Sequence, residues 1–126
     1  MNCVGVDIIE IGRVERAVSR WGQLFLERIY TDGELDTCKG KFPELAARFA
    51  AKEAVMKLLG TGLRGFRWKD IETLSNPDGK PIVYLHGGAQ TRAEKMGLKD
   101  VAISLSHSRE FAVASAVGTA DREVAL

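Results

Sequence analysis

The sequence has little of what marks several large classes of protein. Its 126 residues include two cysteines, three prolines and two histidines. Cys3 and Cys38 show neither CxxC nor zinc-ligand spacing, so we expect reduced thiols in a cytoplasmic protein. No apolar run is long enough to span a bilayer, and the start, MNCVGVDIIE, carries no basic leader. We therefore expect no membrane association and no signal peptide.

An excess of charge of one sign is also lacking. Eighteen basic and seventeen acidic residues leave a net charge of +1, so nothing draws the whole chain to nucleic acid or anionic lipid. Aromatic residues make up 7% of the chain and do not interleave with its arginines, which argues against a nucleic-acid partner. The length and the 45% hydrophobic content suit one domain over residues 1–126. Within it, residues 118–126 are expected to form a loose tail.

The order of helical and strand patterns predicts an α+β domain. Thr31 and Glu34 have the spacing of a capping box at a helix start. Pro43 suits the first turn of the next helix, and Gly60 and Gly62 are expected to end it. The expected helices cover residues 11–21, 32–38, 43–59 and 88–97. The expected strands cover about 2–9, 68–75, 82–86, 101–107 and 111–117, with a turn at NPDGKP, residues 76–81.

Two carboxylates stand at positions that local structure does not favour. Glu53 falls on the apolar face of its helix, with Lys57 one turn further along. Asp7 is the sole charge among residues 2–9, although aspartate is a poor strand former. A shared Mg²⁺ would account for both, because this ion takes one or two carboxylates plus water and phosphate oxygens. The alternative is a backbone-capping aspartate and a solvated Glu–Lys pair.

Three arginines form a stripe on the first expected helix. Arg13, Arg16 and Arg20 lie within about 60° of one another, opposite the apolar side of the helix. They could receive an acidic partner through charge-assisted contacts. A solvated face balanced by Glu10 and Glu15 is the alternative.

Three blocks of sequence carry a resemblance to a known family: GVDIIEIGRVERA, RFAAKEAVMKLLGTGL and ISLSHSREFAVA. Together with YTDGELDTC, FRWKDIETL and GKPIVYLHG between them, they resemble the small phosphopantetheinyl transferases of the holo-[acyl-carrier-protein] synthase kind. The resemblance runs in order along nearly the whole chain. It implies an antiparallel sheet packed with a long helix, and a homotrimer. It also implies transfer of 4′-phosphopantetheine from coenzyme A to a serine of apo acyl carrier protein, leaving adenosine 3′,5′-bisphosphate.

The resemblance also implies roles for particular residues. Asp7 and Glu53 would bind Mg²⁺, and Lys57 would contact the phosphates of coenzyme A. These three are therefore the expected catalytic residues. The proton acceptor for the serine stays open between Glu53 and a water. The arginine stripe would dock the acidic carrier protein. Six residues would contact the nucleotide of the coenzyme: Arg48, Gly79, Lys80, Pro81, His107 and Ser108. They would face the Asp7 of a neighbouring subunit across an interface. Ser108 stands where threonine is common in the family, but the hydroxyl is kept.

Two other functions remain open from the residues alone. A non-catalytic module that binds coenzyme A or an acidic protein would use the arginines and the turn at His107. It leaves Asp7 and Glu53 unexplained, because carboxylates repel a pyrophosphate unless a metal lies between them. A Mg²⁺-dependent nucleotide hydrolase would use the metal site but not the arginine stripe. The residues distinguish neither Mg²⁺ from Mn²⁺ nor a fatty-acid carrier protein from a polyketide one.

Overall fold

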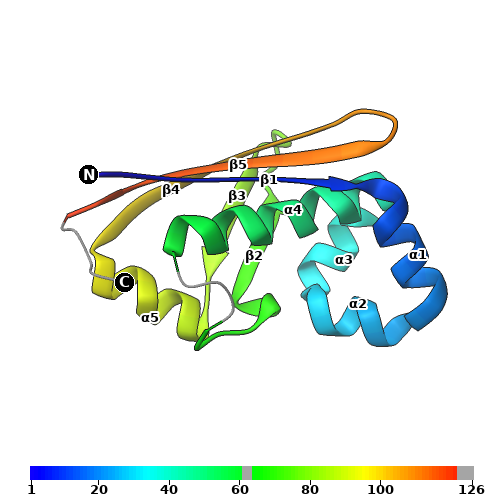
Figure 1. Cartoon of the computed structure of the whole chain (residues 1–126), viewed down its shortest axis with the longest axis horizontal. Helices are drawn as coiled ribbons and strands as arrows, with labels where there is room; N and C mark the ends of the chain where they lie inside the picture. The colour runs from blue at the N-terminus through cyan, green and yellow to red at the C-terminus, as the bar shows by residue number, and fades with distance from the viewer. Residues whose placement is uncertain (61–63, 122–126) are drawn as a thin grey trace.

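A three-stranded antiparallel sheet and one long helix form the centre of the molecule. The computed structural model describes residues 1–60 and 64–121. The sheet has the strand order β1-β5-β4, and helix α4 crosses one of its faces (Figure 1). These elements are β1 (Asn2–Glu10), α4 (Phe42–Leu59), β4 (Leu98–His107) and β5 (Phe111–Ala120). The predicted α+β class, with an antiparallel sheet packed on a long helix, is therefore confirmed.

The remaining elements surround α4, and some of them also contact β4. Three helices gather near the start of α4, a hairpin crosses the helix, and a last helix lies toward its other end (Figure 1). They are α1 (Ile11–Trp21), α2 (Gln23–Ile29), α3 (Asp32–Cys38), η1 (Trp68–Asp70), β2 (Ile71–Ser75), β3 (Pro81–Leu85) and α5 (Gly87–Met96). In the part of the chain that the structure describes, no helix has the length and apolarity needed to cross a membrane.

Small residues let the sheet lie directly on α4. The buried residues on one face of β5 are all small: Ala112, Ala114, Ala116, Gly118 and Ala120. On β1, Gly5 lies so close to the helix that a Cβ atom there would stand 1.9 Å from the carbonyl oxygen of Ala54. No side chain fits in that space. The contact therefore requires glycine at position 5 and sets how closely β1 can approach α4.

A buried ion pair holds the other side of α4. The Nζ atom of Lys52 lies 2.8 Å from Oε1 of Glu34, and both side chains are fully buried. Lys52 also donates to the carbonyl oxygens of Trp68 and Ile71, while Oε2 of Glu34 accepts from the backbone N–H of Thr73. Burial lowers the pKa of Lys52, and the Glu34 carboxylate opposes that shift. The pair joins α3, α4 and β2, and the sequence analysis did not anticipate it.

Several predicted boundaries are confirmed. Thr31 and Glu34 form a reciprocal capping box at the start of α3. Gly60 ends α4 in the left-handed conformation, with φ of 80°. In the turn at residues 76–81, the side-chain oxygen of Asn76 accepts from two backbone N–H groups, which fixes the β2–β3 connection. Gly62, the second expected stop, lies outside the described residues.

Two expectations about the elements were wrong, and one helix was missed. The strand expected from residue 68 starts at Ile71, because the Asp70 carboxylate accepts from the Arg67 backbone N–H and closes a short 3-10 turn. Helix α2, over QLFLERI, was not predicted. The tail expected to be loose from Gly118 is paired through Ala120, since β5 continues beside β1 and Gly118 lies opposite Cys3. Residues 122–126 lie outside the description.

The contact at Gly5 gives a direct test of the fold. We expect Gly5→Ala to lower the free energy of unfolding by about 3 kcal/mol or more, because the new methyl group meets backbone rather than a movable side chain. Gly12→Ala is the matched control. Its Cβ would meet only the end of the Arg16 side chain, at 3.2 Å, within helix α1. The control should keep or raise stability by up to about 1 kcal/mol in urea unfolding. Equal stability of both variants would contradict the close contact.

Candidate functional site

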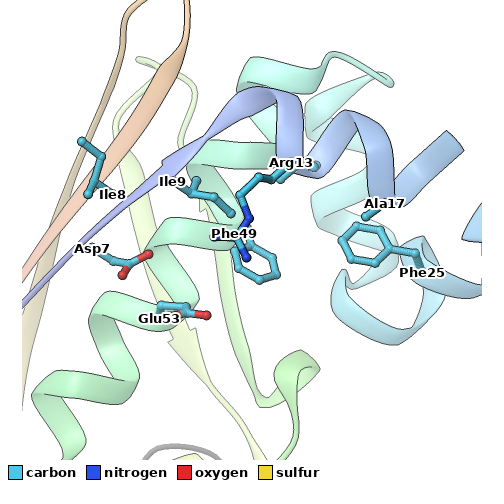
Figure 2. Close-up of a pocket in the computed structure, with 9 residues that line it drawn as sticks. Asp7, Ile8, Ile9, Arg13, Ala17, Phe25, Phe49 and Glu53 are labelled. Carbon is cyan, nitrogen blue, oxygen red and sulfur yellow. The ribbon is translucent and has the colours of Figure 1, made fainter. Parts of the chain in front are cut away.

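The two unusual carboxylates lie together in one hollow between β1 and α4. Asp7 comes from the face of β1 that meets the helix, and Glu53 comes from the middle of α4 (Figure 2). The hollow has a volume of about 270 Å³. Arg13 of α1 points into it from above, and Phe25 and Phe49 supply apolar wall (Figure 2). Residues 46 positions apart in the sequence are thus brought together by the packing of β1 on α4.

The electrostatics of the hollow centre on Glu53. Burial raises the pKa of Glu53 above its ordinary value, and the neighbouring Asp7 carboxylate raises it further. Lys57 and Arg13 act in the opposite direction but do not reverse the shift. Two carboxylates that repel each other at one place are stabilised by a cation shared between them. The hollow therefore has the charge arrangement of a cation site.

Lys57 contacts Asp7. Its Nζ atom donates to Oδ1 of Asp7 at 3.1 Å and to the carbonyl oxygen of Val6 at 2.9 Å. The Glu53–Lys57 spacing had suggested a pair along the helix, and the structure gives Lys57 this partner on β1. The Lys57 side chain is 56% exposed, so its ammonium remains open to an incoming ligand. Lys57 thus contacts one carboxylate, Asp7, and its charge also acts on Glu53.

The donor set suits a hard cation that keeps most of its water. Asp7 and Glu53 supply carboxylate oxygens, the ligands that Mg²⁺ prefers, and one or two carboxylates are its usual protein share. Across residues 1–60 and 64–121, no group of three or more histidine, cysteine, aspartate or glutamate side chains is placed to hold a metal ion. This pair accordingly fits Mg²⁺ better than Zn²⁺, which takes three or four protein ligands, mainly nitrogen and sulfur.

The arginine stripe is on the surface of α1 and leads to the hollow. Arg13, Arg16 and Arg20 are all exposed. Arg13 also lines the carboxylate hollow, so one end of the stripe reaches the candidate site. At the other end, the guanidinium of Arg20 lies over the ring of Trp21, 5.0 Å from its centre. An acidic surface that met this stripe would be held next to Asp7 and Glu53.

A second hollow gathers most of the other predicted residues. Arg48, Gly79, Pro81 and His107 line it together, although they come from α4, the β2–β3 turn and the end of β4. Its lining also includes Glu44 and Ser75, which the sequence analysis missed. It shares no described lining residue with the carboxylate hollow. Helix α4 thus contributes to two separate sites from different faces.

Two predicted residues stand apart from this second hollow. Lys80 is exposed in the β2–β3 turn, where its backbone N–H donates to Asn76. The hydroxyl of Ser108 accepts from the backbone N–H of Phe111 at 3.2 Å, within the turn between β4 and β5. The structure therefore gives the Ser108 hydroxyl a local role in shaping that turn, next to His107.

The aromatic wall of the carboxylate hollow was also missed. Phe49 stacks on Trp68, with ring centres 5.0 Å apart and planes 28° apart. The sequence signal was present, because Phe49 lies one turn before Glu53 on the same helix. An aromatic residue on an apolar helix face is ordinarily core, so nothing local distinguished this ring as the wall of a site.

Comparison with known proteins identifies the family of this chain. Residues 3–116 match the 4′-phosphopantetheinyl transferase superfamily. The holo-[acyl-carrier-protein] synthase of Dehalococcoides mccartyi strain CBDB1 is 52% identical over 117 residues, covering 93% of this chain and 98% of the relative. That of Herpetosiphon aurantiacus is 46% identical over 125 residues, covering 94% and 98%. The chain belongs to the 4′-phosphopantetheinyl transferase superfamily and, within it, to the holo-[acyl-carrier-protein] synthases.

Solved structures agree with this assignment. The Helicobacter pylori holo-[acyl-carrier-protein] synthase in complex with coenzyme A superimposes with a TM-score of 0.84 at 32% identity, covering 92% of this chain and 99% of that one. The Neisseria meningitidis synthase gives a TM-score of 0.85 at 34% identity, covering 93% and 97%. The family resemblance, the fold and the enzyme class expected from the sequence are confirmed.

The shifted pKa of Glu53 predicts how the metal-free protein responds to pH. A raised pKa means that the folded state holds this proton more tightly than the unfolded chain, whose value is near 4.5. The stability that the protonated Glu53 contributes is therefore lost as the pH rises through the pKa that Glu53 has in the folded state. In EDTA, we expect Glu53→Gln to have a higher Tm than the wild type at pH 7 and a flatter Tm profile between pH 4 and 7.

Glu15→Gln is the matched control, because Glu15 is exposed on α1 and lies outside the lining of the hollow. It should leave the pH profile unchanged. A lower Tm for Glu53→Gln than for the wild type at pH 7 would contradict the strained carboxylate pair.

Proposed function

We propose that the Asp7–Glu53 hollow binds the Mg²⁺ ion used in transferring 4′-phosphopantetheine from coenzyme A to a serine of apo acyl carrier protein. The observation that carries the proposal is the meeting of two carboxylates, from β1 and α4, in a chain that belongs to the holo-[acyl-carrier-protein] synthases. When bound, Mg²⁺ would neutralise the charge that grows on the pyrophosphate. Adenosine 3′,5′-bisphosphate would be the second product.

The side chains around the hollow would carry the remaining steps. Lys57, exposed beside Asp7, would donate to the departing phosphate and stabilise its charge. Glu53 or a water would take the proton of the attacking serine hydroxyl. The stacked Phe49 and Trp68 would keep the wall of the site dry and rigid. Most of the rate enhancement would come from positioning and charge neutralisation, as is usual for phosphoryl chemistry.

The second hollow is proposed to hold the nucleotide end of coenzyme A. Arg48 offers a cationic donor and His107 a ring nitrogen, and Gly79 and Pro81 add to the lining. Lys80, exposed in the turn between them, would reach the ligand from outside the lining. Ser108 would support His107 through the turn that its hydroxyl stabilises. The coenzyme A complex of the Helicobacter pylori synthase, which has the same fold, supports a coenzyme site in this chain.

We also propose a homotrimer in a cytoplasmic enzyme. The face of the sheet away from α4 exposes large apolar side chains: Val4, Val6, Ile8, Phe111 and Val117. An exposed apolar sheet face of this kind is typical of a subunit interface. Packing through it would let the nucleotide hollow of one copy approach the carboxylate hollow of the next. Cys3 and Cys38 are both free thiols, which suits a reducing compartment.

Intact-mass spectrometry tests the reaction and its metal together. Apo acyl carrier protein incubated with the wild-type chain, coenzyme A and Mg²⁺ should gain one phosphopantetheine, and EDTA should prevent the gain. Glu53→Gln should lower the rate by at least about a thousandfold, because it removes a metal ligand. Glu15→Gln should react normally.

A second readout is independent of activity. Mg²⁺ should raise the Tm of the wild type, because a ligand that binds only the folded state stabilises it, and should not raise that of Glu53→Gln. Near-normal transfer by Glu53→Gln would refute the metal assignment.

Charge reversal on α1 tests carrier docking. We expect Arg16→Glu with Arg20→Glu to weaken carrier-protein binding at least about tenfold and to spare coenzyme A binding, since both side chains lie outside the two hollows. The matched control is Lys69→Glu with Lys95→Glu, an equal change in net charge at exposed sites on η1 and α5. Surface plasmon resonance gives both affinities. Equal weakening by the two double variants would argue against a docking stripe.

A charge on the outer sheet face tests the trimer. Val6→Lys should convert a trimer into monomers in light scattering, because a lysine at a packed apolar interface loses its hydration without a partner. The variant should also lose transfer activity, since each complete site would need two copies. Gln90→Lys, on the exposed surface of α5, should remain trimeric and active. A wild-type protein that is monomeric and active would contradict this arrangement.

A further inference from the structure

The hollow proposed for the nucleotide contains a carboxylate that a phosphate site would not be expected to hold. Oε2 of Glu44 lies 2.9 Å from Nη1 of Arg48, one helical turn away. Oε1 of the same carboxylate lies 4.0 Å from Nε2 of His107. Glu44 thus stands between the two side chains that would attract an anion. All three line the same hollow.

Arg48 is a buried cation whose partners are few. Its side chain is 4% exposed, and its Nη2 atom donates to the hydroxyl of Ser75 at 3.0 Å. Among the residues that the structure describes, its Nε–H group has no acceptor. Glu44 is the carboxylate that compensates its charge in this arrangement. Removing the anionic partner of a buried arginine is strongly destabilising, because it leaves an uncompensated charge. A phosphate could replace Glu44 as the anionic partner of Arg48, but the negative charge of Glu44 would repel it.

We propose that Glu44 is an internal competitor for the phosphate that binds Arg48, and that it thereby sets both the affinity and the selectivity of this hollow. The inference rests on the proposed function, which assigns the pyrophosphate to the Asp7–Glu53 hollow. The phosphate left for Arg48 is the 3′-phosphate of the coenzyme. A phosphate monoester carries a charge near −2 at neutral pH, so it can replace a single carboxylate as the partner of Arg48.

The competition has a consequence for turnover. The product adenosine 3′,5′-bisphosphate keeps the 3′-phosphate and must leave before the next coenzyme binds. Glu44 is 35% exposed and can turn back to Arg48 as the phosphate departs. The buried guanidinium is then never left without an anion. Glu44 acts through Arg48 and His107, so it is a positioning residue that weakens the hold on the product.

Calorimetric binding of two ligands tests the proposal. The probes are coenzyme A and 3′-dephospho-coenzyme A, each titrated into the wild type and Glu44→Gln. The glutamine keeps an oxygen that can accept from Arg48 but removes the negative charge. We expect Glu44→Gln to bind coenzyme A about five times more tightly, as removal of one partly exposed charge at short range predicts. Its affinity for the dephospho compound should equal that of the wild type.

Two controls separate this proposal from the function on which it rests. Glu94→Gln makes the same change in net charge at an exposed position on α5 and should alter neither affinity. Arg48→Gln should weaken coenzyme A binding in any case, and unchanged binding would refute the assignment of this hollow to the nucleotide.

If Arg48→Gln does weaken coenzyme A binding, two results would still refute the proposed role of Glu44. One is weaker coenzyme A binding by Glu44→Gln, which would show that the carboxylate prepares Arg48 for the ligand. The other is equal tightening for both probes.

Discussion

The contact of β1 with α4 at Gly5 is the constraint on which the candidate site depends. Because a Cβ atom would collide with the Ala54 carbonyl, only glycine lets the strand lie this close to the helix. Asp7 follows two residues later on the same face of the strand, and it therefore reaches Glu53 and Lys57. A wider spacing would move the two carboxylates apart, and the proposed metal site needs them close together. Packing by small residues thus determines the chemistry of the hollow.

A polar anchor on the other side of α4 complements this contact. Lys52 is buried against Glu34, whereas Glu53, the next residue, faces the hollow, since successive helical residues point about 100° apart. The ion pair therefore fixes the rotation of α4 about its own axis. An apolar contact alone would allow the Ala-rich helix to turn by small amounts at little cost. A paired charge in the interior has one acceptable position, which fixes the direction of Glu53.

These two constraints explain what the sequence could and could not reveal. The alternation of β1, the capping box at Thr31 and the stop at Gly60 are local patterns, so their predictions were confirmed. Asp7 and Glu53 were visible because each contradicts its local pattern. The Lys52–Glu34 pair was not, because a lysine in a helix is ordinarily solvated and its partner lies 18 positions earlier. The 3-10 turn before β2 likewise depends on a carboxylate contact that no propensity describes.

The placement of two hollows on one helix bears on why such a small enzyme would assemble. Glu53 serves one hollow and Arg48 the other, from different faces of α4, and the hollows share no described lining residue. Coenzyme A carries a pyrophosphate on the 5′ carbon and a phosphate on the 3′ carbon of one ribose, so binding it calls for both kinds of group. If copies pack through the apolar sheet face that carries Val6, the two kinds of group can meet between neighbours. Assembly would then complete the site as well as cover apolar surface, and a chain of this length could hold a ligand larger than either hollow.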